Sequence, residues 1–420
     1  MNNTKFQLVK GFRDFYPPEM ASRTWLFGKM RQVSRRFGYE EYEGPTLEPL
    51  ALYAAKSGEE LVKKQTFTLT DRSGEKLALR PELTPTLARM VAQKESELVK
   101  PLRWFSIGPR WRYEKPQKGR TREFYQWDVD LLGINSAEAD AEIIALAAEF
   151  FKALNLTPKQ VVIKVNDRRL MEQKLALIEI PSAKTALVIQ AIDKKNKMAE
   201  TDWQEYLQEI DLKPLQIKDL MGILKDRAFA NESEELTALF STLKDLGVAD
   251  YVEFDPTVVR GLDYYTGTVL EAVDRGGEFR TILGGGRYDN LVETVGGQPL
   301  GGVGFACGDK VIEEVLLKYN QWPSLKSIPT QVLVTLFDES FYRQSLALVS
   351  ELRKKGFCAE LYLTPEKLDK QLKYADKKGI PWAVIIGPDE AEKGLVTLKN
   401  LVKKTQKTIP QTALLSELKL

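Results

Sequence analysis

The stretch "EKPQKGRTREFYQWDVD", Glu114 to Asp130, combines a basic loop with a run of alternating aromatic and acidic residues. Four cations fall within eight positions of the loop: Lys115, Lys118, Arg120 and Arg122. Guanidinium and ammonium groups in such a loop can contact polyphosphate or the end of an RNA. A solvated hairpin tip has the same composition, so the loop needs its flanking strands to define a function.

The flanking residues indicate a polar cleft. Arg112 and Glu114 are separated by one residue, so we expect both on the same face of a strand that ends in the loop. The returning strand places four side chains on one face, namely Phe124, Gln126, Asp128 and Asp130. Such a face is not a hydrophobic core. It suits a nucleotide base and a small charged molecule.

The surrounding sequence predicts an α+β domain built on an antiparallel sheet. Two alternating runs, "LRWFSIGPRWRYE" and "EFYQWDVDLLG", form a strand pair, and "TFTLTDRSGEKLALRPE" reads as a hairpin. Leu26, Met30, Val33 and Phe37 form one face of a helix that Gly38 ends. Ser136 is placed to cap a second helix.

Two domains are expected because one core rarely serves 420 residues. The first spans residues 1–323 and contains a mostly helical insertion at about 160–248. A linker rich in proline and serine follows, and residues 328–420 alternate strand and helix as a small α/β domain.

Composition excludes several classes of protein. The chain has a formal net charge of +2, two cysteines without CxxC spacing and no histidine. Histidine-based catalysis, disulfides and cysteine or histidine metal sites, including zinc, are therefore not expected. The polar start "MNNTKFQ" is not a signal peptide and no apolar run spans a bilayer, so we expect a cytoplasmic protein without membrane contact.

Two further segments carry candidate site residues. Glu82 and Thr84 follow a strand in "RPELTPTLAR", where a surface ion pair with Arg80 is the simpler alternative. In "VVRGLDYYTG", Arg260 follows two valines of a buried-looking strand and precedes Tyr264 and Tyr265. A buried arginine requires an anionic partner, either a ligand or Asp263.

The glycine-dense region "LGGGRYDNLVETVGGQPLGGVGFACG" lacks a Walker sequence and a dinucleotide-binding GxGxxG between strand and helix. Its glycines are more consistent with close approach of the backbone to a ligand or to a packed neighbour.

Taken together, "WRYEKPQKGRTREF", "VRGLDYYTGTVLE" and "GGGRYDNLV" resemble the histidyl-tRNA synthetase family of class II aminoacyl-tRNA synthetases. The likeness extends from "GFRDFYPPE" to the terminal module. It implies a class II catalytic domain, a C-terminal anticodon-binding domain and a homodimer formed through the first helix and Pro45. Arg112 to Asp130 match motif 2, and "GVGFACGDK" lies where motif 3 belongs.

The resemblance also implies roles for individual residues. Arg260 and Arg112 would act on the α-phosphate in catalysis. Histidine would be held by Glu82, Thr84, Gln126, Asp130, Tyr264 and Tyr265. ATP, with Mg²⁺ on its phosphates, would be held by Arg112, Glu114, Arg120, Phe124 and Lys310. The acceptor end of the histidine tRNA would contact Lys115, Gln117 and Lys118.

Two positions depart from the family pattern. Motif 3 usually ends in an arginine, whereas this chain has Lys310, which keeps the charge but loses the bidentate fork. Three alternatives follow: Lys310 serves the γ-phosphate itself, Arg120 takes that role, or ATP binds more weakly. Asp130 stands where a glutamate is frequent and shortens the reach slightly.

Two other functions share this fold. A catalytically inactive paralogue would regulate ATP phosphoribosyltransferase, but such paralogues typically lack the terminal module and the arginine at Arg260. An RNA-binding protein that merely kept the fold would not need the ATP-facing residues.

The absence of histidine has its own interpretations. Ordinary usage of roughly two per cent predicts on the order of eight histidines in this length. A ligase without histidine can be translated when histidine is scarce; redesign of a parent sequence, with Tyr125 as one replacement, is the alternative. Either way, the sequence predicts a flat stability profile between about pH 6 and 8.

Overall fold

The computed structural model describes residues 6–54, 64–117, 119–195, 198–260, 264–325 and 327–418. The chain forms two compact units. The first comprises Met1–Asp14 and Arg23–Pro323, and the second comprises Phe15–Ser22 and Ser324–Leu420.

A mixed sheet of mainly antiparallel strands forms the centre of the first unit. Among the described residues it has eight strands in the order β1-β5-β6-β11-β10-β9-β7-β8. Only the edge pairs β1–β5 and β7–β8 are parallel. The strands are β1 (Glu40–Glu41), β5 (Leu102–Trp111), β6 (Glu123–Leu132), β7 (Val161–Asp167), β8 (Val252–Phe254), β9 (Thr268–Asp274), β10 (Leu283–Arg287) and β11 (Gly302–Gly308).

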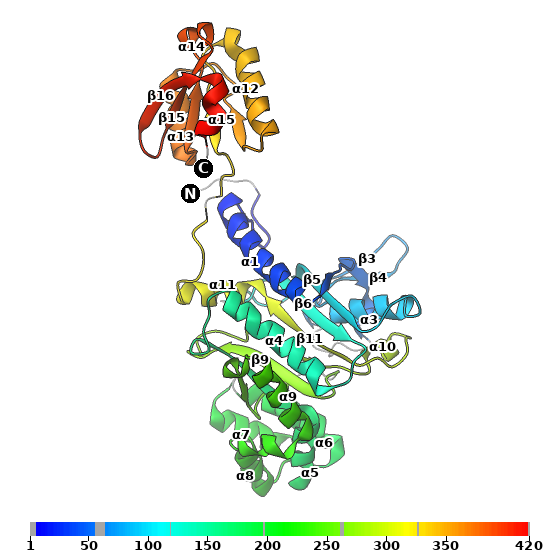
Figure 1. Cartoon of the computed structure of the whole chain (residues 1–420). Coiled ribbons are helices and arrows are strands. Elements are labelled where there is room, and N and C mark those ends of the chain that lie inside the picture. The colour runs from blue at the N-terminus through cyan, green and yellow to red at the C-terminus, as the bar shows by residue number, and fades with distance from the viewer. Residues whose placement is uncertain are drawn as a thin grey trace. The chain divides into compact units, whose positions relative to one another are not determined.

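Helix α4 (Ala137–Ala153) runs along one face of this sheet (Figure 1). The side chain of Ser136 accepts from the Ala139 amide and caps the helix, as predicted. The odd-numbered residues of β6, beginning at Trp127, are buried beneath α4 and α1 (Pro17–Arg36). Alternation along β6 therefore directs Gln126, Asp128 and Asp130 to the opposite face.

The region predicted as a helical insertion begins with a strand of the central sheet. β7 pairs with β9 over seven residues, so the helices follow only from Arg168 onward. Asp167 caps α5, and the Ser233 side chain accepts from the Leu236 amide to cap α9. The helices are α5 (Arg168–Leu177), α6 (Ser182–Lys194), α7 (Glu200–Glu209), α8 (Pro214–Ile223) and α9 (Glu234–Asp245).

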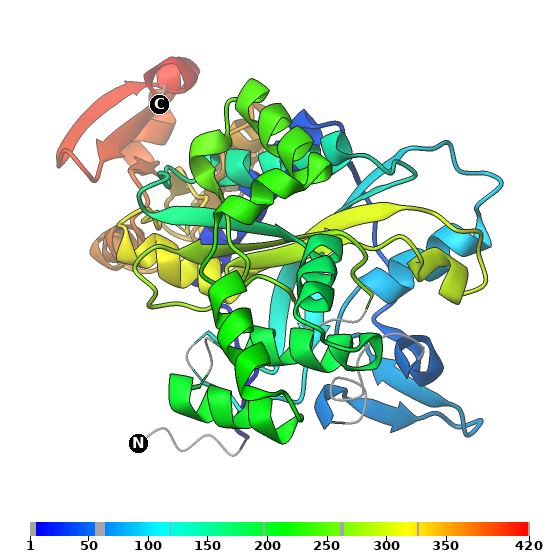
Figure 2. The same cartoon turned by 90° about the horizontal axis from the view of Figure 1, so that it is seen from below.

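A small three-stranded sheet forms a second layer of the first unit. Its order is β2-β4-β3, and the predicted hairpin is present as β3–β4. Asp71 closes the turn by accepting from the amides of Ser73 and Glu75. In both views this sheet lies apart from helices α5–α9 (Figure 1 and Figure 2). The elements are β2 (Leu47–Pro49), α2 (Leu50–Ala54), β3 (Thr68–Thr70), β4 (Lys76–Leu79) and α3 (Thr84–Gln93).

The glycine-dense region forms β10, the short helix α10 (Leu291–Thr294), β11 and then α11 (Asp309–Lys318). β10 and β11 pair with Gly285 opposite Phe305 and Gly286 opposite Gly304. A β-carbon on Gly285 would lie 2.0 Å from the Gly304 carbonyl oxygen. These glycines therefore allow two backbones to approach closely, which is one of the two uses predicted for them.

The second unit contains a five-stranded sheet in the order β13-β12-β14-β15-β16. The first three strands are parallel, and β15 and β16 are antiparallel additions. The strands are β12 (Val332–Val334), β13 (Ala359–Leu361), β14 (Trp382–Ile385), β15 (Leu395–Asn400) and β16 (Thr405–Pro410). The helices are α12 (Tyr342–Lys354), α13 (Leu368–Lys378), α14 (Pro388–Glu392) and α15 (Leu414–Glu417).

Three local expectations require correction. In the segment from Tyr39 to Leu50 the sequence predicts one short strand, with Pro45 at an edge or bulge. The structure has two short strands there, because Gly44 and Pro45 interrupt the pairing. β16, largely exposed and polar, was not predicted because it has no hydrophobic alternation. β5 ends at Trp111, so Arg112 and Glu114 do not share a strand face.

Of the described helices, none is long and apolar enough by itself to cross a membrane; α5 and α6, bent by 117° relative to each other, satisfy the length and composition criteria only as a pair.

We predict that Gly285→Ala destabilises the protein by about 1–3 kcal/mol or more, because the new methyl group meets backbone that cannot rotate away. Gly222→Ala is the control, since a β-carbon there, inside helix α8, meets nothing within 4 Å. It should leave the free energy of unfolding unchanged or raise it by up to about 1 kcal/mol, because alanine is the better helix former. Denaturant titration of both variants measures the difference, and equal effects would contradict the packing argument.

Candidate active site

A polar cavity opens over strands β6, β10 and β11. It gathers side chains from distant segments of the first unit: the turn before α3, the strand β6, and the segments that flank β9 and β10. The predicted residues that line it are Glu82, Thr84, Arg112, Gln126, Asp130, Arg260, Tyr264 and Tyr265. Asp128, Gly284, Tyr288, Gly304, Phe305 and Ala306 also line it.

Glycines on β10 and β11 leave space for two of the charged side chains. A β-carbon on Gly304 would lie 2.3 Å from Asp130 Oδ1, and one on Gly284 would lie 2.3 Å from an Arg260 guanidinium nitrogen. No other residue fits either position without moving the charged group. The glycines predicted to allow approach of a ligand instead allow Asp130 and Arg260 to lie against the sheet.

Asp130 is an acid of the cavity whose protonation is strongly perturbed by its surroundings. It is 4% exposed, and the Tyr288 hydroxyl donates to its Oδ1. Burial raises the pKa of the Asp130 carboxyl to about 8; the nearby Asp128 carboxylate adds to the rise, while the Tyr288 hydrogen bond and Arg110 oppose it. Asp130 is therefore mostly protonated at neutral pH in the ligand-free protein.

Asp128 has a partner of its own. Arg110 donates to Asp128 Oδ2 at 2.7 Å, and both residues are buried. The pair lies on the same face of the sheet as Asp130, one step along the strand. The Arg110 charge therefore offsets the Asp128 charge beneath the cavity. In the part of the chain that the structure describes, Asp130 has no cation of its own within hydrogen-bonding distance.

Arg260 adopts a left-handed backbone conformation, with φ of 52°, which is uncommon for a residue other than glycine. Its guanidinium donates to Glu271 Oε1 at 2.7 Å on β9. Glu271 was missed at the sequence level, and Asp263, the alternative partner, lies outside the described residues. Arg260 Nε is buried and has no partner among the described residues, so this donor remains for a ligand in the cavity.

Arg112 and Phe124 form the outer part of the site. Arg112 Nε donates to the Pro81 carbonyl at 3.0 Å, and its guanidinium lies 5.3 Å from the centre of the Phe124 ring. Beyond Arg112 the chain turns, because the Glu114 amide donates to the Arg112 carbonyl two residues back. The turn explains why strand alternation does not continue to Glu114.

Four of the ATP-binding candidates do not line the cavity. Glu114 and Arg120 pair with each other at 2.7 Å across the basic loop. Lys310 pairs with Glu313 of its own helix at 3.1 Å. Phe124 stands at the start of β6, beneath Arg112.

The basic loop itself is held by backbone contacts. The amides and carbonyls of Gln117 and Arg120 bond to each other and close it. Lys115 precedes this turn on the chain, and Lys118 lies outside the described residues.

Asp309, at the start of α11, is a residue that sequence reasoning missed. Its carboxylate accepts from Arg13 at 2.7 Å and from the Tyr125 amide at 3.0 Å. Asp309 therefore connects the N-terminal segment with Tyr125, the residue of β6 that lies between Phe124 and Gln126. Tyr288 was also missed, although it lies within "GGGRYDNLV". Neither Asp309 nor Tyr288 belongs to a local sequence pattern that would indicate a role in the site before the folded structure is known.

Comparison with known proteins identifies the class and the family. A sequence model of the anticodon binding domain matches residues 331–419. Together with the large mixed sheet and its polar cavity, this defines an aminoacyl-tRNA synthetase with a separate anticodon-binding domain. The histidyl-tRNA synthetase model matches residues 11–311, and the chain belongs to that family.

Individual relatives agree over the whole chain. The histidine–tRNA ligase of Leptospira biflexa is 38% identical over 427 residues, which cover 98% of this chain and 96% of the relative. That of Opitutus terrae is 37% identical over 422 residues, covering 97% and 96%. The crystal structure of histidyl-tRNA synthetase from Nostoc sp. PCC 7120 has a TM-score of 0.82 and 27% identity, and the match covers 99% of each chain.

Asp130 changes the expected dependence of stability on pH. Because the folded-state pKa lies near 8 and an unfolded aspartate titrates near 4, unfolding releases a proton between these values. The free energy of unfolding should therefore fall as pH rises from about 4 to about 8, by up to about 1.4 kcal/mol per pH unit from this group. Although the chain has no histidine to add slope, we therefore expect the profile to slope between pH 6 and 8, whereas composition alone predicts a flat one.

We predict that Asp130→Asn flattens this profile between pH 6 and 8. Asp245→Asn, at the exposed end of α9, is the control and should keep the wild-type slope. Denaturant titrations at pH 6, 7 and 8 measure the slopes. Identical slopes in the wild type and Asp130→Asn would show that Asp130 does not titrate in this window.

Proposed function

We propose that this protein is a histidine–tRNA ligase that activates histidine with ATP and transfers it to the 3′ end of the histidine tRNA. One observation carries the proposal: a single cavity brings Arg112 and Arg260 together with Gln126, Asp130 and the tyrosines. At one side, the two arginines provide positive charge for the carboxylate and the phosphate that react with each other. At the other side, the remaining residues form a polar aromatic surface that suits an imidazole.

The amino acid would occupy the inner part of the cavity. Glu82, Thr84 and Gln126 would bind its ammonium and backbone. Asp130, with Tyr264 and Tyr265, would bind the imidazole ring. Gln126 supports this assignment, because its side-chain oxygen is buried and has no partner among the described residues.

ATP would occupy the outer part. Phe124 would stack on the adenine, and Glu114 would accept from its amino group. Glu114 is paired with Arg120 in this structure, so nucleotide binding would separate the pair and free Arg120 for the phosphates. Lys310 is the other candidate for the γ-phosphate, and it would exchange Glu313 for that group.

Magnesium fits the same arrangement. Among the described residues, no group of three or more cysteine, aspartate or glutamate side chains is arranged to hold a metal ion. Mg²⁺ usually keeps several waters and is held by substrate phosphates with one or two carboxylates, so no dedicated protein cage is required. The ion would supply charge neutralisation on the phosphates.

Activation would proceed by direct attack. A histidine carboxylate oxygen forms a bond to the α-phosphorus, the bond to the bridging oxygen breaks, and pyrophosphate leaves. The nucleophile is already ionised, so no protein base is needed. Arg260 and Arg112 would neutralise charge that builds on the α-phosphate, and their fixed positions reduce reorganisation during the step.

The tRNA would bind through both units. Lys115, Gln117 and Lys118 of the basic loop would contact the acceptor end, which then receives the histidyl group on its terminal ribose hydroxyl as AMP leaves. We further infer a division into a catalytic domain of residues 1–323 and an anticodon-binding domain of residues 328–420, a homodimer and a cytoplasmic location. Sedimentation velocity tests the dimer.

The regulatory paralogue is the alternative. Its chemistry would not require Arg260 or an anticodon-binding domain, and both are present in this chain. No feature of the described site favours that alternative.

ATP–pyrophosphate exchange with each of the twenty amino acids tests the function. We expect exchange with histidine alone. Arg260→Met should lower it by about 10²–10³-fold, the usual cost of one preorganised transition-state donor. Exchange with none of the amino acids would contradict the proposal and favour the regulatory paralogue.

The lack of histidine gives the proposed ligase a testable property. In a translation extract depleted of histidine, full-length protein should still be made from its mRNA. A control with histidine codons at three exposed positions, Lys10, Glu209 and Lys354, should stall. Equal yields from the two messages would contradict the hypothesis that the chain lacks histidine so that it can be translated when histidine is scarce.

A further inference from the structure

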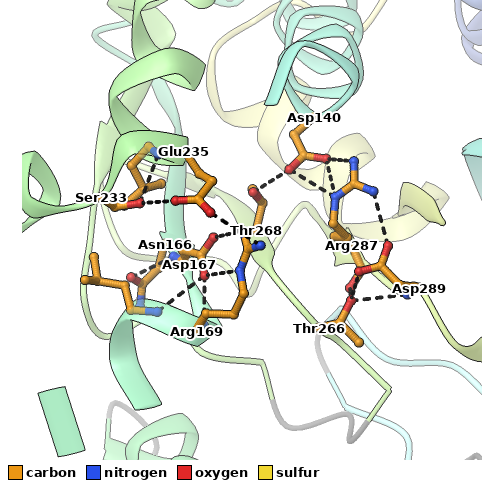
Figure 3. A network of polar contacts seen from close by, with 12 residues as sticks. Asp140, Asn166, Asp167, Arg169, Ser233, Glu235, Thr266, Thr268, Arg287 and Asp289 are labelled. Atoms are coloured by element: carbon orange, nitrogen blue, oxygen red, sulfur yellow. Dashed lines mark hydrogen bonds and ion pairs between the residues drawn. The ribbon is translucent and has the colours of Figure 1, made fainter. Parts of the chain in front are cut away.

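Figure 3 shows a network of buried and partly buried polar contacts, some of whose residues are direct chain neighbours of the cavity tyrosines. Tyr265 is followed directly by Thr266, and Tyr288 stands between Arg287 and Asp289. The Asp289 side chain contacts those of Thr266 and Arg287, and Arg287 also contacts Asp140 of α4. None of these four residues lines the cavity, so any effect on a ligand passes through their neighbours.

Thr266 and Asp289 extend the pairing of β9 with β10. The last ladder pair of the two strands is Gly286 with Val269. Beyond it, the Thr266 amide donates to the Arg287 carbonyl at 2.8 Å, and the Thr266 hydroxyl donates to Asp289 Oδ2 at 2.6 Å. The Asp289 amide donates to the same hydroxyl oxygen at 3.2 Å. The segments that carry Tyr265 and Tyr288 are therefore joined where the strands no longer pair.

Arg287 connects these segments to the end of β6. Its side chain is 2% exposed, and all three guanidinium nitrogens donate. Nε and Nη2 donate to Asp140, while Nη1 and Nη2 donate to the carbonyls of Ile134 and Ser136 at 3.2 Å. Ile134 and Ser136 lie in the turn that follows β6, the strand that carries Asp130. The Arg287 side chain thus fixes the neighbouring Tyr288 relative to β6, the strand that carries Asp130, to which the Tyr288 hydroxyl donates.

The tyrosines themselves contact each other and Asp130. The Tyr288 hydroxyl donates to Asp130, and the ring centres of Tyr264 and Tyr288 lie 6.2 Å apart. Tyr264 and Tyr265 have ring centres 4.7 Å apart. A small shift of either segment therefore changes the shape of the whole aromatic wall against Asp130, because packed rings move together.

A buried ion pair is weak evidence for stability, since apolar residues of the same volume often stabilise a fold equally well. A fully satisfied polar network instead fixes one geometry, because each partner has a preferred direction. Asp140 completes this geometry by also accepting from the Thr268 hydroxyl on β9. The network is therefore better suited to hold positions than to add stability.

We propose that Thr266, Arg287 and Asp289 are positioning residues for recognition of the histidine side chain, which hold Tyr264, Tyr265 and Tyr288 in place against Asp130. They act on the affinity for the amino acid and not on that for ATP, because none of the proposed ATP contacts, Arg112, Glu114, Arg120, Phe124 and Lys310, belongs to this network. The inference rests on the proposed function.

The test uses Thr266→Val, which keeps the shape of the side chain and removes its hydroxyl. In ATP–pyrophosphate exchange we expect the KM for histidine to rise about threefold to tenfold, the usual effect of one or two hydrogen bonds. The KM for ATP should change by less than about twofold. Thr266→Ser, which restores the hydroxyl, should return both values to those of the wild type.

Thr397→Val is the matched control. Its hydroxyl donates to Glu390 Oε1 at 2.8 Å in the second unit, so the same chemistry is removed away from the cavity. We expect both KM values to be unchanged. Should Thr266→Val not fold, Asp289→Asn alters the same contact with nearly the same shape, and the same rise in the KM for histidine is expected.

The outcomes separate the two proposals. An unchanged KM for histidine in Thr266→Val, or an equal rise for histidine and ATP, overturns the positioning role while the proposed function stands. A wild-type protein without histidine-dependent exchange overturns both. A rise confined to histidine and reversed by Thr266→Ser supports the positioning role, since a merely structural contact would lower the melting temperature without separating the two KM values.

Discussion

The approach of the Asp130 carboxylate to the backbone of β11 is the constraint on which the site depends. Gly304 leaves no β-carbon in front of that carboxylate, and Gly284 does the same for Arg260. Gly285 pairs closely with the β11 backbone, so Gly284 and Gly304 lie together at the base of the cavity. An acid and a guanidinium group can therefore both lie against a sheet whose other face carries the core beneath α4.

Charged groups buried at the base of the cavity require partners of opposite charge nearby. Asp128 is balanced by Arg110, and Arg287 by Asp140. Arg80, for which a surface ion pair beside Glu82 was the simpler expectation, is buried and pairs with Glu43. Asp130 is the exception, because its hydrogen-bond partner is a tyrosine hydroxyl and not a cation. Asp130 can therefore change its protonation when a ligand binds, whereas the acids that are paired with arginines keep the surrounding strands and helices in position.

Much of the framework could be predicted from local pattern. The capping of α4 by Ser136, the β3–β4 hairpin and the long pair β5–β6 follow from residues close together in the chain. The even-numbered positions of β6 were expected on one polar face, and Gln126, Asp128 and Asp130 line the cavity. Partners from distant segments could not be predicted in this way. Glu271 for Arg260, Tyr288 for Asp130 and Arg13 for Asp309 are each defined by strand order and helix placement, which local periodicity does not encode.

The sequence by itself determined the secondary structure around the site, the polar face of β6 and, through its motifs, the family. It also determined that no imidazole of the protein takes part, because the chain has no histidine. Only the tertiary structure decided which acid titrates near neutrality, since that depends on burial and on the distance of Arg110 from each carboxylate. It likewise decided that Thr266, Arg287 and Asp289 meet behind the tyrosines, because hydrogen bonds join segments that the chain brings together only after the sheet has formed.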